Sequence, residues 1–170
     1  MKNNIILIGM PGVGKSSLGV ILAKQLGMRF LDSDLVIQEQ EQRLLKEIIE
    51  QEGVDGFLAV EERVNASLDA VHTVIATGGS AVYSKKAMRH LRDLGTVVYL
   101  KLPYGLLTGR LGNLRNRGVV LREGQTLQQL YEEREGLYAQ YADIVIDESG
   151  RDLEQTLEAV LAAVQERIAD

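Results

Sequence analysis

The chain has 170 residues, 45% of them hydrophobic, and its formal net charge at pH 7 is −5. This size fits a single domain, residues 1–170, with a sizeable core and no room for a second domain. The acidic balance argues against a nucleic-acid partner, and the absence of cysteine excludes disulfides and cysteine-bound metals.

The sequence carries no sign of a targeting or membrane segment. The apolar run at residues 5–8 is too short for a signal peptide, and no apolar run approaches the length of a membrane span. We therefore expect a cytoplasmic protein without a membrane partner. We also expect a monomer whose partner is a small-molecule substrate.

The first predicted element, a strand at residues 5–8, runs directly into Gly9-Met10-Pro11-Gly12-Val13-Gly14-Lys15-Ser16. This is the G-x-x-x-x-G-K-[ST] spacing of a phosphate-binding loop, in which backbone N–H groups converge on phosphate oxygens. Lys15 reaches the outer phosphates, and the Ser16 hydroxyl serves Mg²⁺. The candidate nucleotide-binding residues are Gly12, Val13, Gly14, Lys15, Ser16 and Ser17.

A helix follows this loop, because Leu18, Ile21, Leu22 and Leu26 recur at helical spacing. The loop therefore ends at a helix N-terminus, whose dipole and free N–H groups favour an anion. A glycine-rich turn with a chance Gly-Lys-Ser is the alternative. The strand before the loop and the helix after it favour a nucleotide site.

Two carboxylates come next, after a weaker strand candidate at residues 28–31. Asp32 and Asp34 lie one residue apart at the C-terminal edge of the predicted sheet, where ligands of open α/β sheets bind. One acid could hold Mg²⁺ through water while the other orients an acceptor hydroxyl and takes its proton. The alternative is that either residue only caps a helix beginning at Leu35.

Further strands are predicted at residues 73–76, 97–100 and 144–146, and helical patterns separate them. This alternation predicts an α/β fold, a parallel sheet with helices on both faces. The backbone of Thr77-Gly78-Gly79-Ser80 follows the strand at 73–76 and could approach a substrate closely at the same sheet edge. A plain strand-to-helix turn explains these residues about as well.

The helices of the second half have recognisable starts and ends. Thr126 with Gln129 and Asp152 with Gln155 are N-cap and N3 pairs, and Gly95 suits a helix C-terminus. Helical spacing is kept by Phe57, Val60, Val64, Leu68 and Val71, and by Leu153, Leu157, Val160, Leu161, Val164 and Ile168.

The segment 109–124 contains four glycines without sustained periodicity, which predicts a mobile loop. Between Gly109 and Arg122 it carries four arginines and no acid, although the whole chain is acidic. Arginines that close over a phosphoryl group neutralise its charge and expel water, whereas the alternative is a solvated basic loop. These arginines are Arg110, Arg115, Arg117 and Arg122.

Arg134 lies at the centre of an otherwise apolar stripe on the helix after Thr126. Burying an unpaired guanidinium would cost several kcal/mol, so this side chain must meet an anion. A substrate carboxylate or phosphate fits the bidentate geometry of arginine. The alternative is an internal pair with Glu or Asp. The stripe consists of Leu127, Leu130, Tyr131, Arg134, Leu137, Tyr138 and Tyr141.

Taken together, these motifs resemble the shikimate kinase family over nearly the whole chain. The residues that carry the resemblance are Gly9–Ser16, Asp32–Asp34, Gly56-Phe57 with Glu61, Gly78-Gly79, the loop arginines, and Arg134 with Tyr138 before Ala142-Asp143. The resemblance implies ATP-dependent phosphorylation of a ring hydroxyl, from shikimate to shikimate 3-phosphate, with ATP and Mg²⁺. It also implies a P-loop kinase fold of the nucleoside monophosphate kinase type, three-layer α/β/α with a five-stranded parallel sheet.

The same resemblance implies roles for individual residues. The loop at about 109–124 would be a lid, and the helices at about 33–62 would bind the substrate. The catalytic residues would be Lys15, Asp34 and Arg117, and Ser16 and Asp32 would bind the metal. Arg110, near adenine, and Arg151 would be further nucleotide-binding residues. The substrate would be bound by Asp34, Leu58, Gly78, Gly79 and Arg134.

Three positions depart from the family pattern. Leu58 stands where the family has an arginine that clamps the substrate carboxylate, Ser80 stands where it usually has a third glycine, and Gly118-Val119-Val120 stands where the lid reads Pro-Leu-Leu. We expect Leu58 to line the pocket and to weaken shikimate binding. A kinase of a different small hydroxy acid or polyol, or a non-catalytic nucleotide-binding regulatory module, therefore stays open as an alternative.

Overall fold

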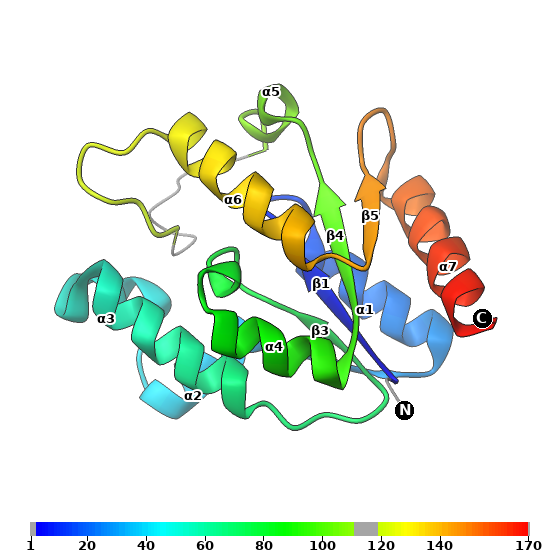
Figure 1. The fold of residues 1–170 in the computed structure, drawn as a ribbon, viewed down its shortest axis with the longest axis horizontal. Helices are drawn as coiled ribbons and strands as arrows, with labels where there is room; N and C mark the ends of the chain where they lie inside the picture. Colours follow the sequence, from blue (N-terminus) through cyan, green and yellow to red (C-terminus); the bar gives the residue numbers. More distant parts are fainter. Residues whose placement is uncertain (1–2, 111–118, 170) are drawn as a thin grey trace.

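The structure is a computed structural model that describes residues 3–110 and 119–169. Five parallel strands form one sheet in the order β2-β3-β1-β4-β5 (Figure 1). All five predicted strands are confirmed, including the weaker candidate at 28–31. They are β1 (Asn4–Ile8), β2 (Arg29–Asp32), β3 (Thr73–Ala76), β4 (Gly95–Lys101) and β5 (Ile144–Asp147).

Helices cover both faces of the sheet and complete the three-layer architecture (Figure 1). One layer contains α1 (Lys15–Leu26) and α7 (Leu153–Ala169), and the other contains α4 (Lys85–Leu94) and α6 (Leu127–Tyr141). The helix α3 (Leu45–Ser67) packs on α4 and on α2 (Ser33–Glu41). Short helical turns, η1 (Ala81–Tyr83) and α5 (Tyr104–Leu107), follow β3 and β4.

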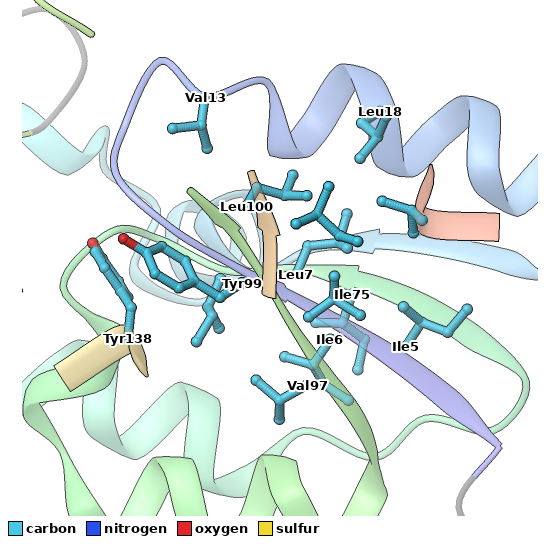
Figure 2. Packing of buried hydrophobic residues seen from close by; sticks show 14 of the residues in the cluster. Ile5, Ile6, Leu7, Val13, Leu18, Ile75, Val97, Tyr99, Leu100 and Tyr138 are labelled. Atoms are coloured by element: carbon cyan, nitrogen blue, oxygen red, sulfur yellow. The ribbon is translucent and has the colours of Figure 1, made fainter. Parts of the chain in front are cut away.

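The central strand β1 is buried along its whole length, as a parallel strand covered on both faces must be. Figure 2 shows Ile5, Ile6 and Leu7 of this strand packed among side chains of β3, β4 and α1. The phosphate-binding loop continues directly from β1, so a fully buried strand holds its position.

Both capping pairs predicted in the second half of the chain are confirmed. The Thr126 hydroxyl accepts from the Gln129 N–H at 3.1 Å, and the Gln129 side chain accepts from the Thr126 N–H at 2.9 Å. Asp152 and Gln155 exchange the same two bonds at 2.8 and 3.0 Å. These bonds satisfy N–H groups that have no partner inside the helix.

The end of α3 and the start of α2 differ from the predictions. The helix α3 ends at Ser67, so Leu68 and Val71 lie beyond it, and Val71 is 65% exposed. The chain must turn there to enter β3, and the Asn4 amide holds the turn by donating to the Ala70 carbonyl at 2.7 Å. The helix α2 begins at Ser33 rather than Leu35, because Asp32 provides its N-cap.

Within residues 3–110 and 119–169, every helix is too short or too polar to cross a bilayer.

The amino-terminal edge of the sheet is tightly packed around Asn4 and Gly95. A Cβ on Gly95 would lie 2.2 Å from the Asn4 carbonyl oxygen, which is a backbone atom and cannot give way without moving β1. Gly95 is thus required by the close approach of two strands, in addition to ending α4 as predicted.

We predict that Gly95→Ala lowers the free energy of unfolding by about 2 kcal/mol or more, since overpacking a core typically costs 1–3 kcal/mol. Gly136→Ala is the matched control, because its new methyl group meets nothing within 4 Å and α6 continues around it. That substitution should raise stability by roughly 0.5–1 kcal/mol through helix propensity. Urea unfolding of both variants measures the difference, and a stable Gly95→Ala protein would contradict this packing argument.

Candidate active site

A cavity of about 390 Å³ opens at the carboxyl edge of the sheet, beside the phosphate-binding loop. Its walls come from that loop, from α2 and α3, from the turn after β3, from Val119-Val120 and from α6. The structure therefore brings together residues that the sequence placed far apart. The lining residues are Pro11, Gly12, Gly14, Lys15, Ser16, Ser17, Asp34, Leu45, Phe57, Glu61, Thr77, Gly78, Gly79, Ser80, Val119, Val120 and Arg134.

The phosphate end of the cavity is the N-terminus of α1. Its N-cap is Gly14, which adopts a left-handed conformation and leaves the first N–H groups of the helix without a side-chain cap. The Lys15 ammonium donates to the carbonyls of Gly9 and Met10 at 2.7 and 2.9 Å, and burial lowers its pKa to about 8. The Val13 side chain is buried in the core, so this residue can offer only its backbone to a nucleotide.

Ser16 and Asp32 form the donor pair on which the sequence predicted a metal. The Ser16 hydroxyl donates to Asp32 Oδ2 at 2.7 Å, and Asp32 Oδ1 accepts from the Asp34 N–H as the N-cap of α2. Asp32 is thus both a helix cap and a neighbour of the loop hydroxyl. Hard oxygen donors suit Mg²⁺. Within the described ranges no cluster of three or more His, Cys, Asp or Glu could hold a metal by itself, so phosphates and waters would supply the other ligands.

Two carboxyl groups converge above Gly78. A Cβ on this glycine would lie 2.7 Å from Asp34 Oδ1 and 2.8 Å from Glu61 Oε2, so a side chain here would force these carboxyl groups to move. Burial and the nearby Asp32 raise the pKa of Asp34 to about 6, against the opposing charge of Lys15. Burial also raises the pKa of Glu61 to about 7, although a hydrogen bond from the Ser80 hydroxyl at 2.6 Å opposes the shift.

The predicted burial of Arg134 is confirmed, since the residue is 1% exposed at the back of the cavity. Its guanidinium donates weakly to the Tyr83 hydroxyl and the Val120 carbonyl, both at 3.4 Å, and lies 5.4 Å from the centre of the Tyr83 ring. In the part of the chain that the structure describes, no carboxylate lies within 4.0 Å of it. The alternative of an internal ion pair is therefore not observed, and the cation is available to an anionic ligand.

Leu58 does not lie where the sequence placed it. It is absent from the walls of the main cavity and instead lines two smaller cavities beside Tyr83 and Val120. The half-buried side chain packs against the apolar cluster formed by α2, α3 and Val120. Helical spacing correctly placed Leu58 near Glu61, but Phe57 is the residue of this turn that reaches the cavity.

The loop arginines separate into different environments. Arg117 and Arg115 fall outside the described residues. Arg122 pairs with Asp55 of α3 at 3.0 Å, and thus with a protein carboxylate rather than with the cavity. Arg110 lies across the end of β5, with its guanidinium 4.0 Å from Glu148. Arg151 lies near the same strand end and donates to the Asp147 carbonyl at 3.2 Å.

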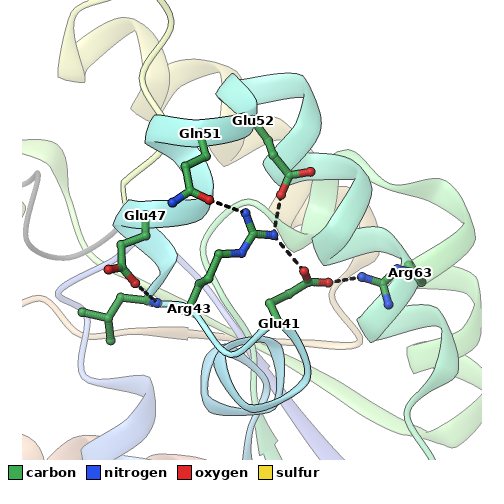
Figure 3. A network of polar contacts seen from close by, with 7 residues as sticks. Glu41, Arg43, Glu47, Gln51, Glu52 and Arg63 are labelled. Carbon is green, nitrogen blue, oxygen red and sulfur yellow. Dashed lines mark hydrogen bonds and ion pairs between the residues drawn. The ribbon is translucent and has the colours of Figure 1, made fainter.

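A polar network fixes the turn between α2 and α3, the elements that carry Asp34 and Glu61. Figure 3 shows Arg43 donating to Gln51, Glu52 and Glu41, and Arg63 reaching Glu41 from farther along α3. The network lies where Gly53 interrupts the helical conformation of α3. It therefore ties together the two segments of α3 on either side of this kink.

Three residues in or near the site were not predicted as site residues from the sequence. Glu61 was noted only as part of a motif, and Tyr83 and Glu148 were not singled out at all. Glu148 had a usable signal, because it directly follows a strand at the ligand-binding edge of the sheet. The position of Tyr83 under the guanidinium had none, since it depends on the path of η1 after β3.

Comparisons with known proteins agree with this geometry. A sequence model of the shikimate kinase family matches residues 11–165. Shikimate kinase 2 of Yersinia pseudotuberculosis is 37% identical over 86% of this chain and 87% of its own length, and shikimate kinase of Persephonella marina is 32% identical over 95% and 99%. The structure of shikimate kinase from Acinetobacter baumannii in complex with shikimate superimposes with a TM-score of 0.87 at 32% identity, covering 97% of this chain and 94% of that chain.

We predict that Glu61 makes the protein less stable as the pH rises. Its pKa in the fold, about 7, lies above the ordinary 4.5, so between these values the unfolded chain releases the proton while the folded chain keeps it. Stability should therefore fall as the pH rises from about 4.5 to 7, by roughly 2–3 kcal/mol from this group. Glu61→Gln retains an acceptor for Ser80 and should be more stable than the wild type at pH 8, but not at pH 4.5.

Thermal unfolding at both pH values measures this effect. Glu50→Gln, at an exposed position of the same helix, is the control and should leave the pH dependence unchanged. A Glu61→Gln protein with the pH dependence of the wild type would show that the buried carboxyl is ionised in the fold.

Proposed function

The chain belongs to the shikimate kinase family, and we propose from this membership that it transfers the terminal phosphoryl group of ATP to the 3-hydroxyl of shikimate. One observation carries the proposal. A phosphate-binding loop, a carboxylate at Asp34 and the unpaired guanidinium of Arg134 share one cavity of about 390 Å³. A bare nucleotide switch would need neither of the last two groups.

The acceptor, shikimate, is held by a charge opposite to its own and by contacts with the protein backbone. Arg134 binds the shikimate carboxylate, which replaces the weak contacts of the guanidinium with a charge-assisted pair. Gly78 and Gly79 line the cavity without side chains, so their backbone can lie against the substrate ring. These contacts turn one hydroxyl toward Asp34.

Asp34 takes the proton of the attacking hydroxyl as the new oxygen–phosphorus bond forms and the bond to the β-phosphate oxygen breaks, releasing ADP. Its raised pKa of about 6 makes it a better proton acceptor than an ordinary aspartate, yet it is mostly ionised at pH 7. Lys15 and the N–H groups of α1 stabilise the charge on the phosphates.

Ser16 and Asp32 would hold Mg²⁺, which neutralises phosphate charge when it is bound. In the same proposal Arg110 and Arg151 contact the nucleotide, and Arg117, which lies outside the described residues, stabilises the charge of the transferred group. The enzyme acts as a monomer in the cytoplasm, where ATP is available.

A second acceptor is favoured by one observation. Leu58 supplies no charge to the cavity, so within the described residues Arg134 is the one guanidinium that lines it. A small hydroxy acid or polyol other than shikimate is therefore a candidate acceptor for the same reaction.

The direct test is ADP formation by the wild type with ATP, Mg²⁺ and shikimate. We expect shikimate-dependent turnover that Asp34→Asn reduces at least about 100-fold, as expected for loss of a proton acceptor. The same variant should still bind ADP in calorimetry, because Asp34 lies on the acceptor side of the cavity. No turnover with millimolar shikimate would reject this acceptor, and turnover with another hydroxy acid or polyol would select the second candidate.

Arg134 and Arg122 offer a matched pair of substitutions. Removing the charge that faces a buried carboxylate typically costs 2–5 kcal/mol, so Arg134→Met should raise the KM for shikimate by roughly 30-fold or more with a smaller effect on the KM for ATP. Arg122→Met removes the same charge from an exposed ion pair and should change the KM for shikimate less than about threefold. Equal effects of the two substitutions in steady-state kinetics would contradict the role of Arg134.

A further inference from the structure

Arg134 is the one guanidinium that lines the main cavity within the described residues, since Leu58 supplies no second charge. Its two hydrogen bonds, from Nε to the Tyr83 hydroxyl and from Nη2 to the Val120 carbonyl, are both long at 3.4 Å. A guanidinium binds a carboxylate well only when two of its N–H groups point at the two oxygens. The orientation of this single group therefore decides how tightly the site holds an acceptor carboxylate.

The ring of Tyr83 gives the guanidinium a contact that uses none of its N–H groups. The Arg134 Cζ lies over the ring, 5.4 Å from its centre, within the range of about 6 Å in which the π face attracts a cation. A carboxylate instead approaches a guanidinium at its N–H groups. The contact with the ring can therefore persist when a carboxylate replaces the two long hydrogen bonds.

The segment that carries Tyr83 is itself fixed. The Tyr83 N–H donates to the Ser80 carbonyl at 3.1 Å within the turn η1. On the two sides of this residue, the hydroxyls of Ser80 and Ser84 donate to Glu61 and Glu62, which are neighbours on α3. The ring is thus anchored to α3, whereas the guanidinium that it contacts comes from α6.

We propose that Tyr83 is a positioning residue, whose ring holds the Arg134 guanidinium in the orientation that binds an acceptor carboxylate. Tyr83 lines the two smaller cavities beside Leu58 and not the main cavity, so it acts through Arg134 and does not touch the substrate. The ring thereby favours acceptors that carry a carboxylate over neutral acceptors of similar shape. The inference rests on the proposed function in one respect, that the acceptor carboxylate binds Arg134.

The test compares shikimate with its methyl ester, which lacks the negative charge, as acceptors in steady-state kinetics with ATP and Mg²⁺. The wild type should prefer shikimate, measured as the ratio of the two kcat/KM values. Tyr83→Leu should raise the KM for shikimate roughly fivefold or more, as expected for loss of a buried contact between a cation and a ring, and should lower this preference by the same factor. Tyr83→Phe keeps the ring and should retain most of the wild-type preference.

A second background separates positioning from support of the fold. In Arg134→Met, the further change Tyr83→Leu should alter the KM for shikimate less than about twofold, because the group through which the ring acts is gone. Tyr104→Leu is the matched control, since Tyr104 is also half-buried but packs on the ring of Tyr131 rather than on a cation. It should leave the preference for shikimate over the ester unchanged.

Two results would overturn the role of Tyr83. In the first, Tyr83→Leu keeps the wild-type preference for shikimate. In the second, it lowers kcat/KM equally for shikimate and the ester, so that the ring only supports the fold. If Tyr83→Leu does not fold, Tyr83→Met fills the space with a flexible apolar side chain and should show the same loss of preference. A wild type that phosphorylates neither acceptor would overturn the proposed function and this inference with it.

Discussion

The site depends on one constraint, a guanidinium buried to 1% exposure without a carboxylate within reach in the described chain. The protein compensates only in part, with two long hydrogen bonds and the face of Tyr83. The surrounding structure keeps the group in place, since Tyr138 on the same helix bonds to the Gly79 carbonyl at 2.6 Å. The Arg134 guanidinium is thus a buried positive charge without a carboxylate partner at a fixed position, which favours binding of an anionic ligand.

Most of the fold could be predicted from local signals. The apolar segments, the phosphate-binding loop and the capping pairs each depend on residues close in the sequence, and all are confirmed. The end of α3 could not be predicted, because the helical spacing continues to Val71 while a hydrogen bond from Asn4, more than sixty residues away, turns the chain. Strand ends located the site, but they gave no information on which side chains of a helix turn reach it, as Leu58 and Phe57 illustrate.

Two of the three departures from the family pattern lie next to Glu61. Ser80 donates to this carboxyl group, and Leu58 precedes it by about one turn of α3 without offering it a charge. A neutral hydroxyl stabilises an ionised carboxylate less than a cation does, which is consistent with a pKa raised to about 7. Burial thus disfavours the ionised form of both carboxyl groups that approach Gly78, Asp34 and Glu61.

The hydrogen bonds of Lys15 affect how the enzyme binds its nucleotide. Two of the three N–H groups of the ammonium already donate to carbonyl oxygens of its own loop, and these bonds hold the loop in place before any ligand binds. When a phosphate binds, the Lys15 ammonium exchanges hydrogen bonds to the Gly9 and Met10 carbonyls for bonds to phosphate oxygens, while the loop keeps its conformation. Because these bonds already hold the loop backbone, binding a phosphate requires less ordering of the chain than a loose loop would.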